Sequence, residues 1–134
     1  DDTGLEIDAL NGAPGVRSKR WKGEDMNDAE LVDYTLQQLK GVPQGKRGAQ
    51  LHCVLALALP SGEVYTASGV LRGEILEKPY PRQDPGHPFR SLLFLPQMNK
   101  VYVELTDEEE HALDSHRKTA LQKILPMLEA WING

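Results

Sequence analysis

Two adjacent carboxylates open the chain, in the tetrapeptide Asp1-Asp2-Thr3-Gly4. Carboxylate oxygens, a hydroxyl and a backbone without a Cβ atom therefore lie within four residues. These are the groups that a hard cation such as Mg²⁺ needs when it bridges to phosphate oxygens. The same four residues also make a good solvent-exposed turn. Taken alone, this stretch leaves both interpretations open.

A second group of reactive side chains, Ser115-His116-Arg117, lies near the other end of the chain. A hydroxyl, an imidazole and a guanidinium fork suit the carbonyl edge of a purine and an anion. The same triplet is also typical of the polar face of a helix. We do not interpret His111 and His116 as a zinc pair, because their spacing turns the two side chains apart on a helix and no cysteine or third histidine accompanies them.

A basic segment follows a turn at Pro14 and Gly15. Its cations are Arg17, Lys19 and Arg20. Such a run suits the phosphate oxygens of a ligand in a cleft, and it equally suits a solvated loop or a subunit contact. The sequence alone does not choose between these interpretations.

The composition describes an acidic chain of moderate hydrophobicity. Its 134 residues are 40% hydrophobic and carry a net charge of -5, which fits a single domain over residues 1–134 that buries roughly two-thirds of its unfolded surface. A chain without a broad basic face is not expected to bind nucleic acid. No stretch approaches the ~20 apolar residues of a membrane-spanning helix, and no signal-peptide pattern opens the chain, so we expect no membrane partner.

The only cysteine, Cys53, lies in an apolar run, so no disulfide can form within the chain. A reducing compartment, the cytoplasm, is therefore the expected location. We interpret Cys53 as a small buried side chain rather than a nucleophile. Its neighbour His52 is more typical of a satisfied core or edge histidine than of a metal ligand.

The elements that must position these groups form an α/β fold with a mixed, largely antiparallel sheet and flanking helices. Near-continuous apolarity predicts a central strand over 49–59, and a turn over 60–63 leads into a returning strand over 64–67. Three further strands are predicted over 69–76, 91–95 and 100–105. The segment 78–88 holds four prolines and is predicted to be irregular.

A capping box predicts the first helix. Asn27 is followed three residues later by Glu30, and the helix is expected to run through Lys40 and to stop at Gly41. Its apolar stripe indicates that it packs on one face as a scaffold element.

A second capping box, Thr106 with Glu109, predicts one long C-terminal helix that includes the serine-histidine-arginine triplet near its start. The acidic residues 107–110 are explained by the positive end of this helix. Pro126 is expected to bend the helix or to split it in two.

The order of these motifs resembles the signature of the inosine triphosphate pyrophosphatase (ITPase) family. The matching segments are Asp-Asp-Thr-Gly-Leu at 1–5, Leu-x-Gly-x-Pro-Gly at 10–15, Ser-x-Arg at 18–20, Gly-x-x-x-Gly-x-Ile at 69–75 and Ser-His-Arg-x-x-Ala-Leu at 115–121. Members of this family hydrolyse non-standard purine nucleoside triphosphates to the monophosphate and pyrophosphate. The resemblance implies a partial version of the elongated two-lobed ITPase architecture, a nucleoside triphosphate substrate, Mg²⁺ as cofactor and a homodimer.

The resemblance also implies roles for individual residues. Asp2 would hold the metal or act as general base on the attacking water, and Thr3 would hydrogen-bond the substrate. Base and phosphate contacts would come from the triplet Ser115, His116 and Arg117. His111 stands where family members place a lysine, and because histidine is charged only when it is protonated, near and below its pKa of ~6.5, the pH optimum would be lower than that of a lysine site.

The sequence departs from the family pattern where the base should bind. Typical members carry Gly-Phe-Gly-Tyr-Asp-Pro before a Phe-x-Pro, and here Pro88, Phe89, Arg90 and Ser91 take the places of Phe, Gly, Tyr and Asp. Phe89 or the guanidinium plane of Arg90 still offers a flat surface for a base. Because Ser91 replaces the aspartate, the resemblance leaves open a different, a relaxed or an absent base preference.

Family members also have a preceding segment with a Thr-x-Asn-x-x-Lys motif for the triphosphate and an acidic metal ligand, and this sequence contains neither. We therefore expect a fragment or a member that has lost this part. The first functional hypothesis is an Mg²⁺-dependent nucleoside triphosphate pyrophosphatase. The alternatives are a non-catalytic nucleotide-binding or assembly module and a nucleotide-cleaving enzyme with another base preference.

Overall fold

The framework of the protein is a six-stranded sheet in the order β2-β1-β3-β4-β5-β6, and every neighbouring pair is antiparallel. The computed structural model describes residues 1–134. The strands are β1 (Asp2–Ile7), β2 (Pro14–Gly15), β3 (Gly48–Ala58), β4 (Val64–Ile75), β5 (Leu93–Leu95) and β6 (Lys100–Val101). The helices are α1 (Asp28–Gln38), α2 (Asp107–Ala112) and α3 (His116–Asn133), and short 3₁₀ turns include Pro88–Ser91 and Tyr102–Glu104. The predicted α/β class is confirmed, and the sheet, predicted to be mixed and largely antiparallel, is antiparallel throughout.

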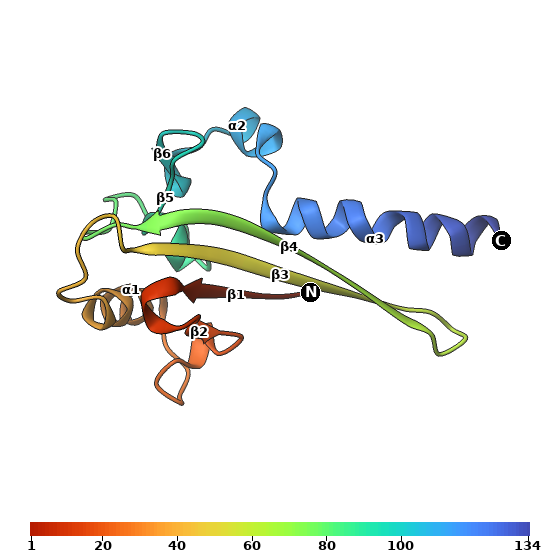
Figure 1. Ribbon diagram of the computed structural model, residues 1–134, viewed down its shortest axis with the longest axis horizontal. Coiled ribbons are helices and arrows are strands. Elements are labelled where there is room, and N and C mark those ends of the chain that lie inside the picture. The colour runs from red at the N-terminus through yellow and green to blue at the C-terminus, as the bar shows by residue number, and fades with distance from the viewer.

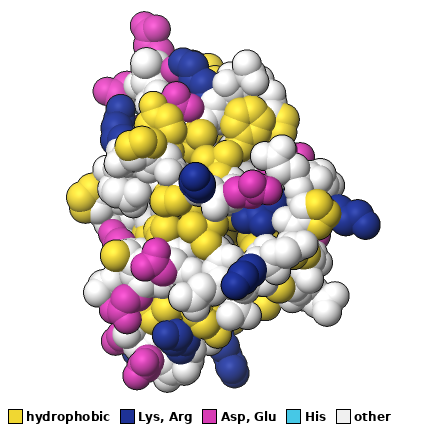
Figure 2. Space-filling model, turned by 90° about the vertical axis from the view of Figure 1, so that its left-hand side faces the viewer, with side chains coloured by type: hydrophobic (Ala, Val, Ile, Leu, Met, Phe, Trp, Pro, Cys, Tyr) yellow, Lys and Arg dark blue, Asp and Glu magenta, His cyan; other side chains and the backbone are white.

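The long hairpin of β3 and β4 sets the shape of the molecule. Figure 1 shows the hairpin and α3 extending side by side away from the shorter strands and α1. The other end of the molecule, drawn in Figure 2, carries acidic and basic side chains interspersed around apolar ones. None of the three helices is both long enough and apolar enough to span a membrane.

Strand β4 is one continuous element where the sequence predicts two. It pairs with β3 without interruption, from Gly48 opposite Glu74 to Ala58 opposite Val64. The prediction was wrong because Gly69 looked like the start of a new strand. Its absent side chain serves another purpose, since a Cβ atom there would collide with the backbone of α3 at His116. Gly69 therefore allows α3 to lie directly against the sheet.

The capping box of α1 is confirmed. The side chain of Asn27 accepts a hydrogen bond from the Glu30 amide at 2.9 Å, and the Glu30 carboxylate accepts one from the Asn27 amide at 3.3 Å. The helix ends at Gln38, two residues before the predicted end. The strands predicted over 91–95 and 100–105 are shorter than expected, because 3₁₀ turns replace the beginning of the first and the end of the second.

The prediction of one long C-terminal helix from Thr106 was wrong. Helix α2 ends at Ala112, and Leu113 takes an extended conformation with ψ of 132° that places its side chain in the core. Ser115 then caps a new helix, its hydroxyl oxygen accepting from the Lys118 amide at 3.1 Å. Helix α3 continues through Pro126, so this proline does not split the helix in two.

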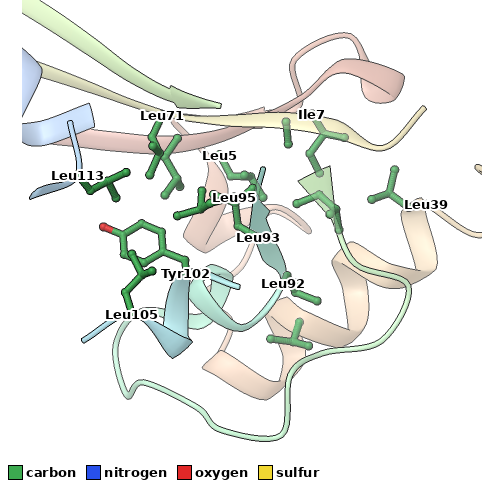
Figure 3. Packing of buried hydrophobic residues seen from close by; sticks show 14 residues of the cluster. Leu5, Ile7, Leu39, Leu71, Leu92, Leu93, Leu95, Tyr102, Leu105 and Leu113 are labelled. Atoms are coloured by element: carbon green, nitrogen blue, oxygen red, sulfur yellow. The ribbon is translucent and has the colours of Figure 1, made fainter. Parts of the chain in front are cut away.

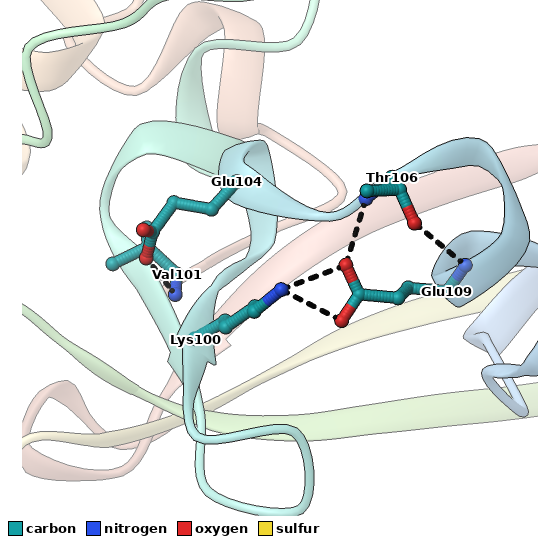
Figure 4. Close-up of polar contacts among 5 residues, drawn as sticks. All are labelled: Lys100, Val101, Glu104, Thr106 and Glu109. Atoms are coloured by element: carbon teal, nitrogen blue, oxygen red, sulfur yellow. Dashed lines mark hydrogen bonds and ion pairs between the residues drawn. The ribbon is translucent and has the colours of Figure 1, made fainter.

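The second capping box is confirmed, at the start of α2. Thr106 and Glu109 exchange hydrogen bonds of 3.0 and 3.2 Å, and the Glu109 carboxylate also accepts two from Lys100, at 2.9 and 2.8 Å (Figure 4). These donors, with Lys100 first, lower the pKa of Glu109. Helix α2 is thereby tied to β6.

The core lies between one face of the long strands and the segment that runs from the 3₁₀ turn at Pro88–Ser91 to Leu113, and Val32 and Leu39 join it from α1 and its end. In Figure 3, Leu5, Ile7 and Leu71 of the sheet face residues of that segment, which include Leu92, Leu93, Leu95, Tyr102, Leu105 and Leu113. Cys53 is fully buried, as predicted.

Arg47 is a buried cation at one end of this core, with 5% of its surface exposed. Its guanidinium donates four hydrogen bonds of 2.8 to 3.0 Å, all to backbone carbonyl oxygens: those of Leu39, Val42, Ile75 and Leu76. Arg47 therefore joins the end of α1 to the end of β4.

Candidate functional site

An ion pair joins the two ends of the chain. Arg117, in the first turn of α3, donates a hydrogen bond from Nε to the Asp1 carboxylate at 2.7 Å. The other oxygen of the same carboxylate accepts from the Thr3 hydroxyl at 3.0 Å. The opening acidic residues and the serine-histidine-arginine triplet therefore meet.

Beside this ion pair lies a cavity of about 490 Å³. Six of the residues to which the family resemblance assigns a role line it: Asp2, Thr3, Phe89, Arg90, His116 and Arg117. They come from the first strand, from the segment after the proline-rich loop and from the start of α3. These six residues therefore bring three parts of the chain that are far apart in sequence to one cavity.

A larger hollow of about 800 Å³ lies over Asp8, Lys46 and Arg72. Arg72 and Asp8 face each other there with two hydrogen bonds of 3.0 and 2.7 Å, and the Arg72 guanidinium lowers the pKa of the Asp8 carboxyl. Because these charges neutralise each other and none of the predicted site residues lines the hollow, we place the site in the cavity beside Arg117.

The carboxylate of Asp2 accepts no hydrogen bond and forms no ion pair. Asp28, the other carboxylate in the wall, accepts a hydrogen bond from the Gly86 amide at 2.8 Å and so holds the loop above the cavity. No three His, Cys, Asp or Glu side chains gather at one point to cage a metal ion. Mg²⁺ at phosphate sites commonly needs only one or two carboxylates, with phosphate oxygens and water as the other ligands. A free Asp2 carboxylate fits this second mode.

Three side chains hold Arg90 in the cavity wall. Its Nη1 donates to Asp84 at 3.1 Å and to Glu110 at 3.0 Å, and its guanidinium carbon lies 4.7 Å from the centre of the Tyr102 ring. Burial raises the pKa of Tyr102, so this ring stays uncharged. Glu110 therefore does more than complement the helix end, which is the only role that the sequence predicts for the acidic run.

His116 is the most buried polar group of the site, with 6% of its surface exposed. Its Nδ1 atom has no hydrogen-bond partner in the protein. Burial, and then the charges of Arg117 and Arg90, lower the pKa of His116 to about 4. At neutral pH the ring is uncharged, and it can offer one donor and one acceptor but no positive charge.

Three other residues that the sequence singles out do not line the cavity. Ser91 is almost fully buried and donates its hydroxyl hydrogen to the Pro88 carbonyl oxygen at 3.0 Å. His111 is exposed on α2, where its Nδ1 lies 2.9 Å from the Asp107 carbonyl oxygen. Ser115 acts as the N-cap of α3. Their roles toward a ligand remain predictions.

The cations of the basic segment also differ in whether they line the cavity. Lys19 lines the cavity, whereas Arg20 turns outward and pairs with Asp25 at 2.8 Å. The sequence leaves open which of these cations faces a ligand, and of Arg17, Lys19 and Arg20 only Lys19 lies in the cavity wall. Asp28 and His87 also line the cavity and were not predicted, since neither belongs to a recognisable motif.

Comparison with known proteins places these features in context. A family model described as the Ham1 family matches residues 1–127. The dITP/XTP pyrophosphatase of Geobacillus kaustophilus is 40% identical over 134 residues, which are 100% of this chain and 64% of that protein. The dITP/XTP pyrophosphatase of Bacillus subtilis is 38% identical over 97% of this chain and 64% of its own length.

Solved structures agree with this relationship. The Staphylococcus aureus Ham1 protein superposes with a TM-score of 0.83 at 31% identity, over 96% of this chain and 65% of its own. A nucleoside-triphosphatase, or dITP/XTP pyrophosphatase, of Mycobacterium abscessus superposes with a TM-score of 0.77 at 36% identity, over 93% and 64% of the two chains. This chain thus spans just under two thirds of the length of these relatives.

Proposed function

Because this chain belongs to the Ham1 family, we propose that its cavity binds a purine nucleoside triphosphate and that the protein hydrolyses it, with Mg²⁺, to the monophosphate and pyrophosphate. The substrates that we propose are ITP, XTP and dITP. The observation that carries this proposal is the meeting of Asp2, Thr3, His116 and Arg117 around one cavity.

The charges around the cavity support binding of a polyphosphate. Lys19 and Arg117 lie in its wall and are suited to phosphate oxygens. The positive charge of Arg117 is shared with Asp1, which fixes the direction of the guanidinium. The half-buried ring of Phe89 is suited to stack on a base.

The reaction needs a water molecule that is activated for in-line attack on the α-phosphorus. Asp2 is the group that we propose for this step, either by accepting the proton of the water or by holding the metal ion. When bound, Mg²⁺ would neutralise phosphate charge and favour attack at phosphorus. Thr3 is proposed to hydrogen-bond the substrate, and neutral His116 is proposed to contact the base.

A second candidate function is a nucleotide-binding or assembly module without catalysis. One observation favours it, because Asp2 is the only carboxylate in the cavity wall that is not already hydrogen-bonded. One free carboxylate leaves few groups to activate water for phosphoryl transfer. It is sufficient for binding a metal-nucleotide complex.

The remaining parts of the proposal concern the state of the protein. We propose that residues 1–134 fold as one domain, that the protein is a homodimer and that it acts in the cytoplasm. Exposed apolar side chains on α3, among them Leu121, Trp131 and Ile132, support a subunit contact. Light scattering coupled to gel filtration measures the oligomeric state, and a monomer at micromolar concentration would contradict the dimer.

The proposed function is tested by measuring pyrophosphate release from ITP, XTP and dITP with Mg²⁺. We expect turnover by the wild-type chain and a loss of at least about 100-fold in Asp2→Asn, which is the usual scale for removing a general base. Asp25→Asn is the matched control, since Asp25 is an exposed carboxylate that pairs only with Arg20. Nucleotide binding without any pyrophosphate release would favour the non-catalytic module.

A further inference from the structure

Arg90 uses only one of its three guanidinium nitrogens to bind the protein. Nη1 donates to both Asp84 and Glu110, whereas Nε and Nη2 donate to no protein group. Arg47, which is buried, uses all three of its guanidinium nitrogens within the protein. Arg90 is only partly buried and lies in the cavity wall, so its Nε and Nη2 are accessible to a bound ligand.

The guanidinium is also held against an aromatic ring. Its carbon lies 4.7 Å from the centre of the Tyr102 ring, and the side chain is 24% exposed. Because Tyr102, Asp84 and Glu110 already contact the guanidinium, Arg90 is less suited to stack on a base than the sequence predicts. What remains open is the edge of the guanidinium, where Nε and Nη2 form a planar fork of two parallel donors.

The charge of Arg90 argues against a phosphate as its ligand. Asp84 and Glu110 both lie within hydrogen-bond distance of Nη1 and together more than offset its positive charge. Lys19, also in the cavity wall, has no such counterion. An arginine fork whose charge is already compensated fits a pair of neutral acceptor atoms better than it fits an anion.

A second unpartnered polar atom lies in the same wall. His116 is more than nine-tenths buried, and its Nδ1 has no partner. With Phe89 next to Arg90, the cavity combines a flat apolar surface, a donor fork and a neutral imidazole. This set matches the face and the edge of a purine ring.

We propose that Arg90 is a specificity-determining residue, which donates from Nε and Nη2 to the O6 and N7 atoms of a 6-oxopurine base. The identification of the ligand as a purine nucleotide rests on the proposed function. The O6 and N7 acceptors form the pair that arginine binds in a bidentate manner, whereas adenine presents an amino donor in place of O6. The cavity therefore selects hypoxanthine and xanthine over adenine through this contact.

The test measures the dissociation constants of ITP and ATP by calorimetry in EDTA, where no Mg²⁺-dependent turnover interferes. We expect the wild-type chain to bind ITP about 10- to 100-fold more tightly than ATP, the usual discrimination of one bidentate arginine-purine contact. Arg90→Lys keeps the charge and removes the fork, so the ratio should fall close to one while ATP affinity stays nearly constant. An equal loss for both nucleotides would mean that Arg90 binds phosphate, and it would overturn the inference, as would an unchanged ratio.

A second measurement needs no variant, in case Arg90→Lys does not fold. The wild-type chain should bind 7-deaza-dITP about 10-fold more weakly than dITP, because the analogue lacks the N7 acceptor and leaves one charged donor without its hydrogen bond. Equal affinities for the two compounds would overturn the inference.

The two proposals fail in different ways. If the chain binds ITP in preference to ATP through Arg90 but releases no pyrophosphate, the inference stands and hydrolysis fails. If pyrophosphate is released and Arg90→Lys leaves the preference unchanged, hydrolysis stands and the inference fails. A wild-type chain that binds neither nucleotide contradicts both.

Discussion

Arg117 donates a hydrogen bond to Asp1 at 2.7 Å although 116 positions separate the two residues in the chain. Arg117 also lines the cavity, together with Asp2, Thr3 and His116. The presence of this hydrogen bond means that the first strand and the last helix form one site rather than two independent surfaces.

Removing the Arg117 guanidinium should weaken nucleotide binding much more than folding. Arg117 and Asp1 are about half exposed, and exposed ion pairs contribute about 0–1 kcal/mol to the free energy of unfolding. We therefore expect Arg117→Ala to leave the midpoint of thermal unfolding within a few degrees of wild type and to raise the dissociation constant for ITP about 10-fold or more. Lys123→Ala is the matched control, as a cation on the same helix outside the cavity. Equal effects of the two substitutions on binding would contradict the assignment.

His116 should make the protein less stable as the pH falls below neutrality. Its pKa in the folded protein is about 4, below the ordinary value of 6.5, because it is buried beside Arg117 and Arg90. Between these two pH values the unfolded chain takes up a proton that the folded chain does not, so stability is lost as the pH falls from about 6.5 toward 4 and is fully present above that range. The loss at pH 5 should be about 2 kcal/mol.

Urea unfolding of wild type and His116→Asn at pH 7 and pH 5 measures this effect. The variant lacks the titrating ring, so its loss of stability between the two pH values should be smaller by about 2 kcal/mol. Identical pH dependence in the two proteins would show that His116 titrates normally.

Gly69→Ala should displace α3. A Cβ atom at this position would collide with the helix backbone at His116 and Ala120, and such overpacking typically costs about 1–3 kcal/mol. Val70→Ala is the control, since Val70 is the next residue of β4 and is exposed on the opposite face. Urea unfolding compares the two, and nucleotide binding should fall only in Gly69→Ala, because α3 carries His116 and Arg117.

Arg47→Met should destabilise the fold, although Arg47 lies outside the cavity. The substitution leaves four carbonyl oxygens without their donor in a buried place, at roughly 1–3 kcal/mol for each buried group that stays unsatisfied. Lys46→Met, at the exposed neighbouring position, should unfold close to the wild-type midpoint in a thermal melt. A wild-type midpoint for Arg47→Met would contradict the structural role of this buried cation.

Local patterns were enough to predict the β3–β4 hairpin and both capping boxes, but not the strands β1 and β2. The apolar run of β3 and the Asn27 and Thr106 boxes act over a few residues, so their signals are visible in the sequence. The break before Ser115 was missed because Leu113 fits the apolar stripe of a helix equally well, and only its place in the core decides its conformation.

The parts of the site that could not be predicted depend on long-range contacts. Asp84 and Glu110 reach Arg90 from the proline-rich loop and from α2, and neither local sequence indicates such a pairing. Gly69 looks like a strand boundary until the helix that it accommodates is known. In both cases a contact between distant segments decides what the residue does.

The most direct test of the account is an NMR titration of the ¹⁵N-labelled chain with ITP. If the cavity between β1 and α3 is the nucleotide site, the amide shifts that change most will belong to Thr3, Lys19, Phe89 and Arg117. Shift changes that gather instead around Asp8, Lys46 and Arg72, or no changes at millimolar ITP, would contradict it.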